Sequence, residues 1–267
     1  MITFDELIAS FADHQNGVHK AVAPQEWSQG RTLYGGMSAA LCQVAARQIV
    51  GDETPLRAAQ FCFVGPAGGN LTGDAELLRR GKSTAIVEAT LRTEQGIGTR
   101  AILSYGKSRE SRIAQDTLKM PDVPPPSDCP WLWGKEPSRE NITSFPANFD
   151  SRRAGGHMPL SEQADGELLV WVRHHRSAES DQTAALLALG DVLPPACVTM
   201  FAEWAPISTM TWSMEILADN IEVKDRWFLF KSVAEHTTDG YSSQAMYLWD
   251  EAGNPVIAAR QNVTIFV

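Results

Sequence analysis

The chain has 267 residues and a formal net charge of −9 at pH 7, with 43% hydrophobic and 21% charged residues. This composition is ordinary for a globular protein, and the length is sufficient for one large domain or two small ones. The negative charge argues against general binding to nucleic acid or to anionic membranes, because both require a cationic surface. No run of about twenty uninterrupted apolar residues occurs, so we expect no membrane-spanning helix.

The N-terminus and the cysteines indicate a cytoplasmic protein. The first residues are acidic and lack the basic flank of a secretory signal, whereas Thr3 and Glu6 have the spacing of a capping box and predict a short first helix. The four cysteines are scattered without metal-ligand spacing, at Cys42, Cys62, Cys129 and Cys197. This usage is typical of reduced thiols, and we expect neither a disulfide framework nor a metal site.

Residues 18–106 show the pattern of one helix among strands. A short strand over residues 18–23 leads through a loop to a helix over residues 37–50, whose apolar positions recur at helical spacing. Four segments with clustered or alternating β-branched and aromatic residues follow, separated by Gly-containing turns that are typical of antiparallel strands. These segments are RAAQFCFVG, NLTGDAELLRRG, STAIVEATLRTEQG and IGTRAILSYG.

The same order returns from Gly166. The strand ELLVWVRHHR precedes the helix QTAALLALGD, and four further strand-like segments reach the C-terminus. The repetition predicts a duplicated α+β fold with antiparallel sheets. Residues 107–165 are polar and Pro-rich, which favours a crossover linker, although Trp131 and Trp133 suggest that part of it packs down. We therefore expect an N-terminal unit (1–106), a linker (107–165) and a C-terminal unit (166–267).

This tandem arrangement resembles the double hotdog thioesterases, and more narrowly the acyl-CoA thioesterase II group, over residues 18–267. Three pieces carry the resemblance: WSQGRTLYGG before the first helix, RRGKS after a strand, and the trio of Asp191, Thr209 and Gln261. The resemblance implies two long central helices wrapped by a curved antiparallel sheet. It also implies hydrolysis of acyl-CoA to free acid and CoA without a cofactor, with the catalytic acid in the C-terminal unit.

In that family an Asp, a Thr or Ser, and a Gln hold the attacking water, and these roles fall on Asp191, Thr209 and Gln261. Asp191 stands in the apolar stretch LALGDVLPP, where a charge is costly unless it is paired or functional. A carboxylate there can accept a proton from water, or less favourably attack the thioester itself to form an anhydride. It can also be a helix-terminal residue that bonds a nearby backbone group or an Arg.

The hydroxyl of the trio has more than one candidate on the same strand. Family members often continue with Asp-His after the Thr, whereas Thr211 and Trp212 stand here. Strand alternation predicts Thr209 and Thr211 on one face and Ser208 on the other, so Ser208 is the weaker rival and Thr209 and Thr211 both remain candidates.

The oxyanion of thioester hydrolysis needs hydrogen-bond donors, and helix N-termini offer unpaired amides. Gly35, Gly36 and Met37 open the first helix, and we predict that the Gly36 and Met37 amides lie beside Asp191. The first helix contains no Asp or Glu, and the second begins with Asp181 in place of Gly-Gly, so we expect one working site in the chain.

Substrate binding requires positive charge for the CoA phosphates. Arg79, Arg80 and Lys82 form the best local cluster, and the family resemblance favours Arg79. A solvated basic strand end explains the same cluster equally well.

Two other functions fit a hotdog fold: an enoyl-CoA hydratase, and a non-catalytic acyl-CoA or acyl-carrier binding protein. Hydratase chemistry usually pairs an Asp with a His, and no His lies near Asp191 in sequence. We expect His174 and His175 at the surface. The edges of hotdog sheets often pair between subunits, which favours a homodimer or larger homo-oligomer.

Overall fold

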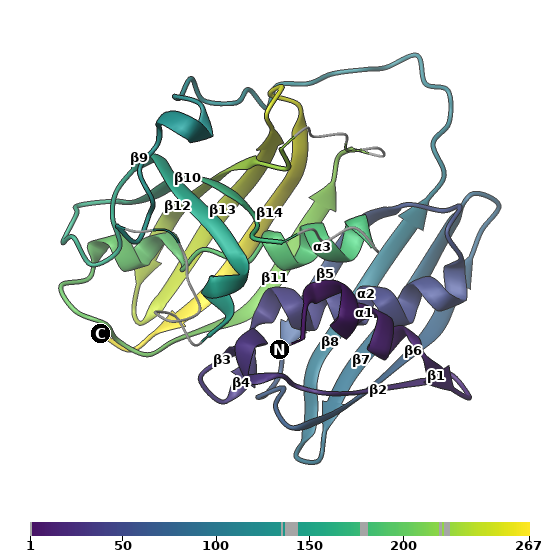
Figure 1. The fold of residues 1–267 in the computed structure, drawn as a ribbon. Helices are drawn as coiled ribbons and strands as arrows, with labels where there is room; N and C mark the ends of the chain where they lie inside the picture. Colours follow the sequence, from purple (N-terminus) through teal and green to yellow (C-terminus); the bar gives the residue numbers. More distant parts are fainter. Residues whose placement is uncertain (1, 135, 137–143, 177–180, 219–220, 222–224) are drawn as a thin grey trace.

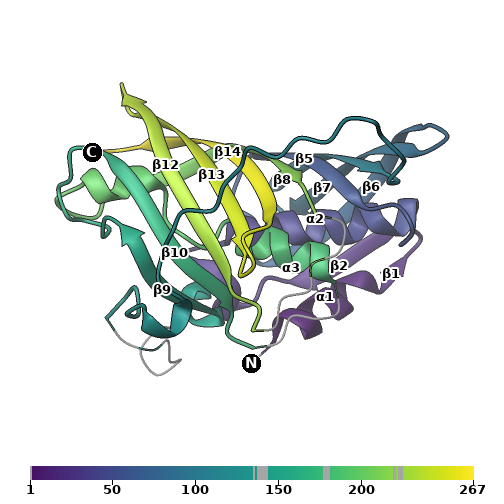
Figure 2. The ribbon, with the colours of Figure 1, turned by 90° about the horizontal axis from the view of Figure 1, so that it is seen from above.

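The computed structural model describes residues 2–134, 136, 144–176, 181–218, 221 and 225–267. Within these residues, one curved antiparallel sheet of twelve strands wraps around the helices (Figures 1 and 2). The helices are α1 (Phe4–Ala12), α2 (Gly35–Val50) and α3 (Gln182–Leu189). A separate two-stranded ribbon, β3 (Ser28–Gln29) with β4 (Thr32–Leu33), precedes α2.

The sheet consists of two similar halves. The strands of the first half are β1 (His14–Gln15), β2 (Val18–Val22), β5 (Leu56–Phe63), β6 (Asn70–Arg80), β7 (Thr84–Thr93) and β8 (Gly96–Gly106). Those of the second are β9 (Phe149–Gly156), β10 (Gly166–His174), β11 (Ile207–Ile216), β12 (Phe228–Thr238), β13 (Tyr241–Asp250) and β14 (Pro255–Ile265). From the centre outward, the first half runs β5-β8-β7-β6-β2-β1 and the second runs β11-β14-β13-β12-β10-β9. The antiparallel pair β5–β11 joins the two halves, and the order of the strands confirms the predicted repetition.

The first helix begins as the capping box predicted. The Thr3 side chain accepts from the Glu6 backbone amide, and the Glu6 carboxylate accepts from Thr3 N–H at 2.7 Å. Four apolar side chains of α1 are buried against the rest of the core: Phe4, Leu7, Ile8 and Phe11.

The two central helices differ in length. α2 has 16 residues and is buried along most of its length, whereas α3 has only eight residues and ends before a turn at Gly190 and Asp191, with Pro194 and Pro195 following. The expectation of two long helices is therefore met by α2 alone. Because a Pro cannot donate a backbone hydrogen bond, the chain after α3 is poorly suited to extend the helix.

The two helices pack side by side in opposite directions. Arg47 near the end of α2 forms an ion pair with Asp181 at the start of α3, with 2.9 Å between Nη1 and Oδ2. At the other end, Gly36 contacts the carbonyl oxygen of Ala188 so closely that a Cβ would stand 2.7 Å from it. The amides that open α2 therefore lie beside the residues that close α3.

The segment 107–165 contributes to the sheet. Its residues 149–156 form the edge strand β9, which pairs with β10. The sequence had predicted a linker over all of residues 107–165. Earlier parts of the segment pack on the second half, because Trp171 Nε1 donates to Pro124 O at 2.9 Å and Trp249 Nε1 donates to Leu118 O at 3.0 Å. Among the described residues, no helix has the length and apolarity needed to cross a membrane.

Candidate active site

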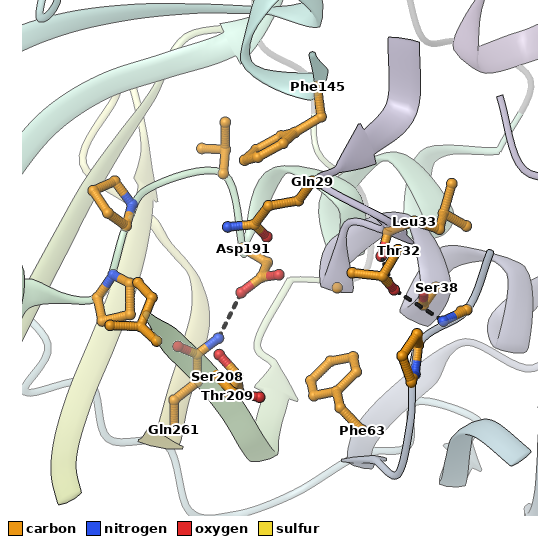
Figure 3. Close-up of a pocket in the computed structure, with 18 of the residues that line it drawn as sticks. Gln29, Thr32, Leu33, Ser38, Phe63, Phe145, Asp191, Ser208, Thr209 and Gln261 are labelled. Carbon is orange, nitrogen blue, oxygen red and sulfur yellow. Dashed lines mark hydrogen bonds between the residues drawn. The ribbon is translucent and has the colours of Figure 1, made fainter. Parts of the chain in front are cut away.

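A cavity of about 760 Å3 lies where the start of α2, the turn after α3 and the strands β11 and β14 meet. Figure 3 shows Asp191 and Gln261 joined by a hydrogen bond, with Ser208 and Thr209 nearby. Much of the rest of the lining is apolar, including Phe63, Phe145, Val192, Leu193 and Trp204. This mixture of an apolar wall and a few polar groups is typical of a small-molecule site.

Asp191 is half-buried in this cavity and accepts two hydrogen bonds. Gln261 Nε2 donates to Asp191 Oδ1 at 2.6 Å, and the Gly36 backbone N–H also donates to the carboxylate. Burial raises the pKa of Asp191 to about 7, although both hydrogen bonds act to lower it. A carboxylate with this pKa can exchange protons near neutral pH, as a general base must.

Two glycines allow the start of α2 to approach Asp191. A Cβ on Gly35 would stand 2.5 Å from Asp191 Oδ2, and one on Gly36 would collide with the Tyr34 ring as well as with Ala188 O. The structure therefore brings Gly35 and Gly36 to Asp191. Met37 differs from expectation, because its amide donates to Tyr34 O at 3.1 Å.

The side chain of Tyr34 makes contacts beside the cavity that sequence reasoning missed. Tyr34 caps α2, its hydroxyl donates to Ala188 O near the end of α3, and its ring stacks on Phe145 at 4.4 Å. Burial and the nearby Asp191 raise the pKa of the Tyr34 phenol. The residue therefore ties the start of α2 to the end of α3 beside the cavity.

The strand that carries the candidate hydroxyls has a bulge. Thr209 pairs with Val263 and Thr211 pairs with Asn262, so Met210 is an extra residue between them. The prediction from strand alternation was therefore wrong here, because Ser208 and Thr209 both line the cavity. Thr211 is exposed, and the next residue, Trp212, is buried on the other face of the strand.

The predicted basic cluster does not lie at this cavity. Arg79, Arg80 and Lys82 are exposed, and Arg80 Nη2 donates to Ile49 O near the end of α2 at 2.9 Å. Ile49 is 14 residues beyond Gly35, a separation of about 21 Å along a helix. Among the described lining residues, Arg31 is the one that carries positive charge.

The equivalent place in the first half is built differently. Asp191 is ten residues after the cap of α3, and the tenth residue after Tyr34 in α2 is Val44. Close to Val44, Asp181 at the start of α3 forms an ion pair with Arg47 of α2. At the cavity, the start of α2 instead has glycines beside Asp191. The first half therefore has Val44 at the position of Asp191, and an ion pair in place of the glycines.

The sequence predicted His174 at the surface, whereas in the structure it is half-buried. Its ring packs against Phe4 at 5.0 Å and Phe149 at 4.8 Å, and its Nε2 contacts Ala185 O at 2.9 Å. Burial lowers the pKa of His174 to about 4. The helix α1 and the strand β9, which cover this end of β10, explain the difference. No histidine is among the described residues that line the cavity.

The sequence matches two family models that together span most of the chain. Residues 23–106 match the acyl-CoA thioesterase N-terminal domain, and residues 121–265 match the acyl-CoA thioesterase C-terminal domain. The chain therefore belongs to the acyl-CoA thioesterase family. A comparison with curated protein sequences finds no match.

The similarity to solved structures extends over almost the whole length of this chain and of the matched chains. A hot dog fold protein of unknown function from Alicyclobacillus acidocaldarius has a TM-score of 0.83 at 22% identity and covers 97% of this chain and 98% of its own. The tesB protein of Mycobacterium avium subs paratuberculosis has a TM-score of 0.77 at 12% identity, with coverage of 97% and 98%. The acyl-CoA thioesterase II TesB2 from Mycobacterium marinum has a TM-score of 0.74 at 18% identity, again covering 97% and 98%. At these identities the likeness shows the hotdog fold.

Proposed function

We propose that this protein hydrolyses an acyl-CoA thioester to the free acid and CoA in the cavity beside Asp191. The observation that carries the proposal is the half-buried carboxylate of Asp191, held by Gln261 and Gly36, with a pKa of about 7. The membership of the acyl-CoA thioesterase family supports the choice of substrate.

In the proposed reaction, Asp191 accepts a proton from a water molecule as that water attacks the thioester carbonyl carbon. Gln261 and Thr209 hold the water, because both line the cavity beside the carboxylate. Collapse of the tetrahedral intermediate breaks the carbon–sulfur bond, and the proton held by Asp191 leaves with the CoA thiol.

The growing charge on the carbonyl oxygen is placed at the start of α2. We assign the stabilisation of this charge to the N–H of Gly35, which lines the cavity, because the Gly36 N–H already faces Asp191. First-turn amides lack partners within the helix, and the helix dipole adds positive potential there. Such donors stabilise an oxyanion, which is usually the largest contribution to acyl-transfer catalysis.

The cavity also suggests how the two ends of the substrate are bound. Apolar side chains such as Phe63 and Phe145 are suited to the acyl chain, and Arg31 supplies positive charge for the CoA phosphates. We do not assign this role to Arg79, Arg80 or Lys82, because Arg80 lies at the far end of α2.

A hydratase is disfavoured because the described lining contains no histidine to pair with Asp191. Release of free thiol from a panel of acyl-CoAs of increasing chain length tests the proposal against the remaining functions. We expect thiol release from at least one chain length, with equal amounts of free acid. Tight acyl-CoA binding without thiol release would instead identify a binding protein, and hydration of an enoyl-CoA would identify a hydratase.

A further inference from the structure

Gln261 is the second side chain in a row of hydrogen bonds that begins at a backbone amide. Ala196 N–H donates to Gln244 Oε1 at 2.7 Å, Gln244 Nε2 donates to Gln261 Oε1 at 2.8 Å, and Gln261 Nε2 donates to Asp191. Gln244 is 1% exposed and Gln261 is 4% exposed, so both side-chain amides are buried. Three consecutive bonds therefore connect a backbone group with the candidate base.

The direction of this row is determined at its backbone end. A backbone N–H can only donate, so Gln244 must present its oxygen to Ala196 and its NH2 group to Gln261. Gln261 must then accept through Oε1 and donate through Nε2 to Asp191. Turning either amide over would bring two buried donors or two buried acceptors face to face, which is costly.

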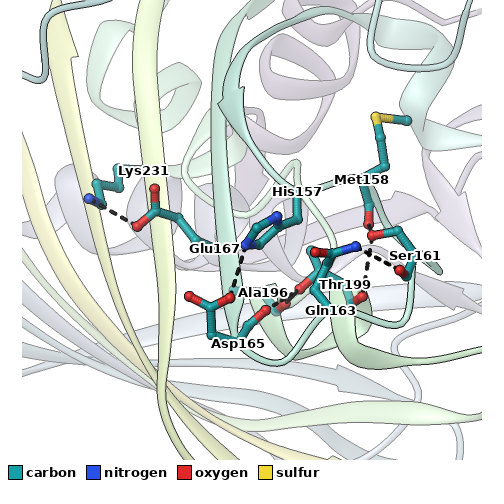
Figure 4. Close-up of polar contacts among 9 residues, drawn as sticks. All are labelled: His157, Met158, Ser161, Gln163, Asp165, Glu167, Ala196, Thr199 and Lys231. Atoms are coloured by element: carbon teal, nitrogen blue, oxygen red, sulfur yellow. Dashed lines mark hydrogen bonds and ion pairs between the residues drawn. The ribbon is translucent and has the colours of Figure 1, made fainter.

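The backbone end is itself held by a cluster of polar contacts (Figure 4). Ala196 opens the 3-10 helix η4 (Ala196–Met200), in which Thr199 is fully buried. The Thr199 hydroxyl contacts Ala196 O at 2.8 Å and Asp165 O at 3.2 Å, and Gln163 N–H donates to Thr199 O at 3.1 Å. These contacts hold the first turn of η4 in place, and with it the Ala196 amide.

We propose that Gln244 is a positioning residue for the proposed hydrolysis: it holds the Gln261 amide so that its NH2 group, and not its oxygen, faces Asp191. The inference rests on the proposed function. A donor facing Asp191 stabilises the carboxylate, which is the form that can accept a proton from water. An oxygen in that place would stabilise the protonated acid, which cannot act as the base.

The charged surroundings of Asp191 are simple enough for this effect to be measured. The strands β11 and β14 present the uncharged Ser208, Thr209 and Gln261 to the cavity, and residues 192–195 after Asp191 are uncharged as well. Near the start of α2, the titratable group close to Asp191 is the phenol of Tyr34. Apart from Asp191 itself, the charged residue of the described lining is Arg31.

Gln244→Met removes the hydrogen bonds of the Gln244 amide to Ala196 and Gln261, and its weaker one to Met246 Sδ, with little change in side-chain volume. We expect the pKa of Asp191, measured by 13C NMR of the Asp carboxyl carbons without substrate, to rise by about one unit, the size of effect typical of a hydrogen bond to a charged group. We also expect kcat/KM to fall about tenfold at pH 5.5 and to stay within about twofold of the wild type at pH 9, since one pKa unit is one factor of ten below the pKa.

Gln43→Met is the matched control, because Gln43 is also a buried glutamine (2% exposed). It accepts from Tyr105 Oη at 2.6 Å, and it does not line the cavity. Its loss should leave the pKa of Asp191 and the pH profile unchanged. If Gln244→Met lowers activity equally at every pH without moving the pKa of Asp191, the role of Gln244 is structural and the proposal is wrong.

Two further measurements keep the inference separate from the proposed function and from misfolding. In a Gln261→Met background, Gln244→Met should no longer change the pKa of Asp191, because the effect passes through Gln261; a full additional shift would contradict this. In the wild type, an NMR coupling across the hydrogen bond from Gln261 Nε2 to the Asp191 carboxyl carbon should be present. Finding the Gln261 oxygen at Asp191 instead would overturn the proposal, whether or not the protein releases thiol.

Discussion

Gly35 lies so close to Asp191 that a Cβ on the glycine would stand 2.5 Å from Asp191 Oδ2, and 3.2 Å from the Phe63 ring. A methyl group there must displace the carboxylate or the start of α2. The contact explains why a glycine opens the long helix beside the acid that follows the short one.

Gly35→Ala is therefore expected to lower kcat/KM by on the order of a hundredfold, because misplacement of a catalytic group by about 1 Å has an effect of that size. Gly106→Ala is the control, since its nearest contact would be an ordinary 3.4 Å from Arg57 Cγ. Steady-state kinetics of the two variants measure this difference. An equal loss of kcat/KM in Gly35→Ala and Gly106→Ala would contradict the role given to Gly35.

The pKa of Asp191 determines how activity and stability depend on pH. With a pKa of about 7 in the folded protein, the carboxylate form is populated as the pH rises through 7, so kcat/KM should rise over this range. A profile that is flat from pH 5 to 9 would be inconsistent with Asp191 as the base.

The raised pKa of Asp191 also predicts that the stability of the fold decreases as the pH rises, whereas the activity increases. The folded state keeps a proton on Asp191 that the unfolded chain releases near pH 4, so this group stabilises the fold at low pH and loses that contribution as the pH rises from about 4 to 7. Relative to Asp191→Asn, the wild type should lose roughly 2–3 kcal/mol of unfolding free energy between pH 5 and pH 8. Urea denaturation at both pH values measures this difference, and parallel behaviour of the two proteins would show that the pKa is not raised.

The bulge at Met210 separates the two candidate threonines. Thr209→Val should lower kcat by about ten- to a hundredfold, since it removes a hydroxyl that lines the cavity. Thr211→Val, the matched control on the opposite face of β11, should stay within about twofold of the wild type, as surface changes usually do. If kinetic measurements show a larger loss of kcat in Thr211→Val than in Thr209→Val, Thr211 is the residue that holds the water.

Arg31 is expected to act on binding. Arg31→Ala should raise KM for an acyl-CoA by about tenfold while leaving kcat nearly unchanged, because a phosphate contact is made equally in the ground and transition states. KM for an acyl thioester of N-acetylcysteamine, which lacks the phosphates, should not change. Arg79→Ala, at the other end of α2, is the control; an effect of Arg79 alone would locate the phosphates there.

Local sequence patterns predicted the elements of this fold well. The capping box at Thr3, the long helix ending at Val50 and the repeated strand order all depend on short-range periodicity and turn chemistry, which is visible in the residues themselves. The contrast between the two halves also led to Asp191 and the glycines at the start of α2, which the structure brings together.

The remaining features depend on long-range contacts. The bulge at Met210 reverses the face of Thr209 relative to Thr211, and its only trace is in the pairing with β14. The covering of His174 needs α1 and β9, and Gln244 looks like an ordinary residue of a half-buried strand until Ala196 and Gln261 are placed on either side of it. Alternation along one strand cannot reveal such partners.

Thiol release by the wild type and by Asp191→Asn, measured side by side on an acyl-CoA that the wild type hydrolyses, tests the central claim most directly. Since a general base typically contributes 10²–10⁴-fold, we predict a loss of kcat of about a thousandfold with KM within a few-fold and a folded variant. A turnover near that of the wild type in Asp191→Asn would contradict the mechanism proposed here.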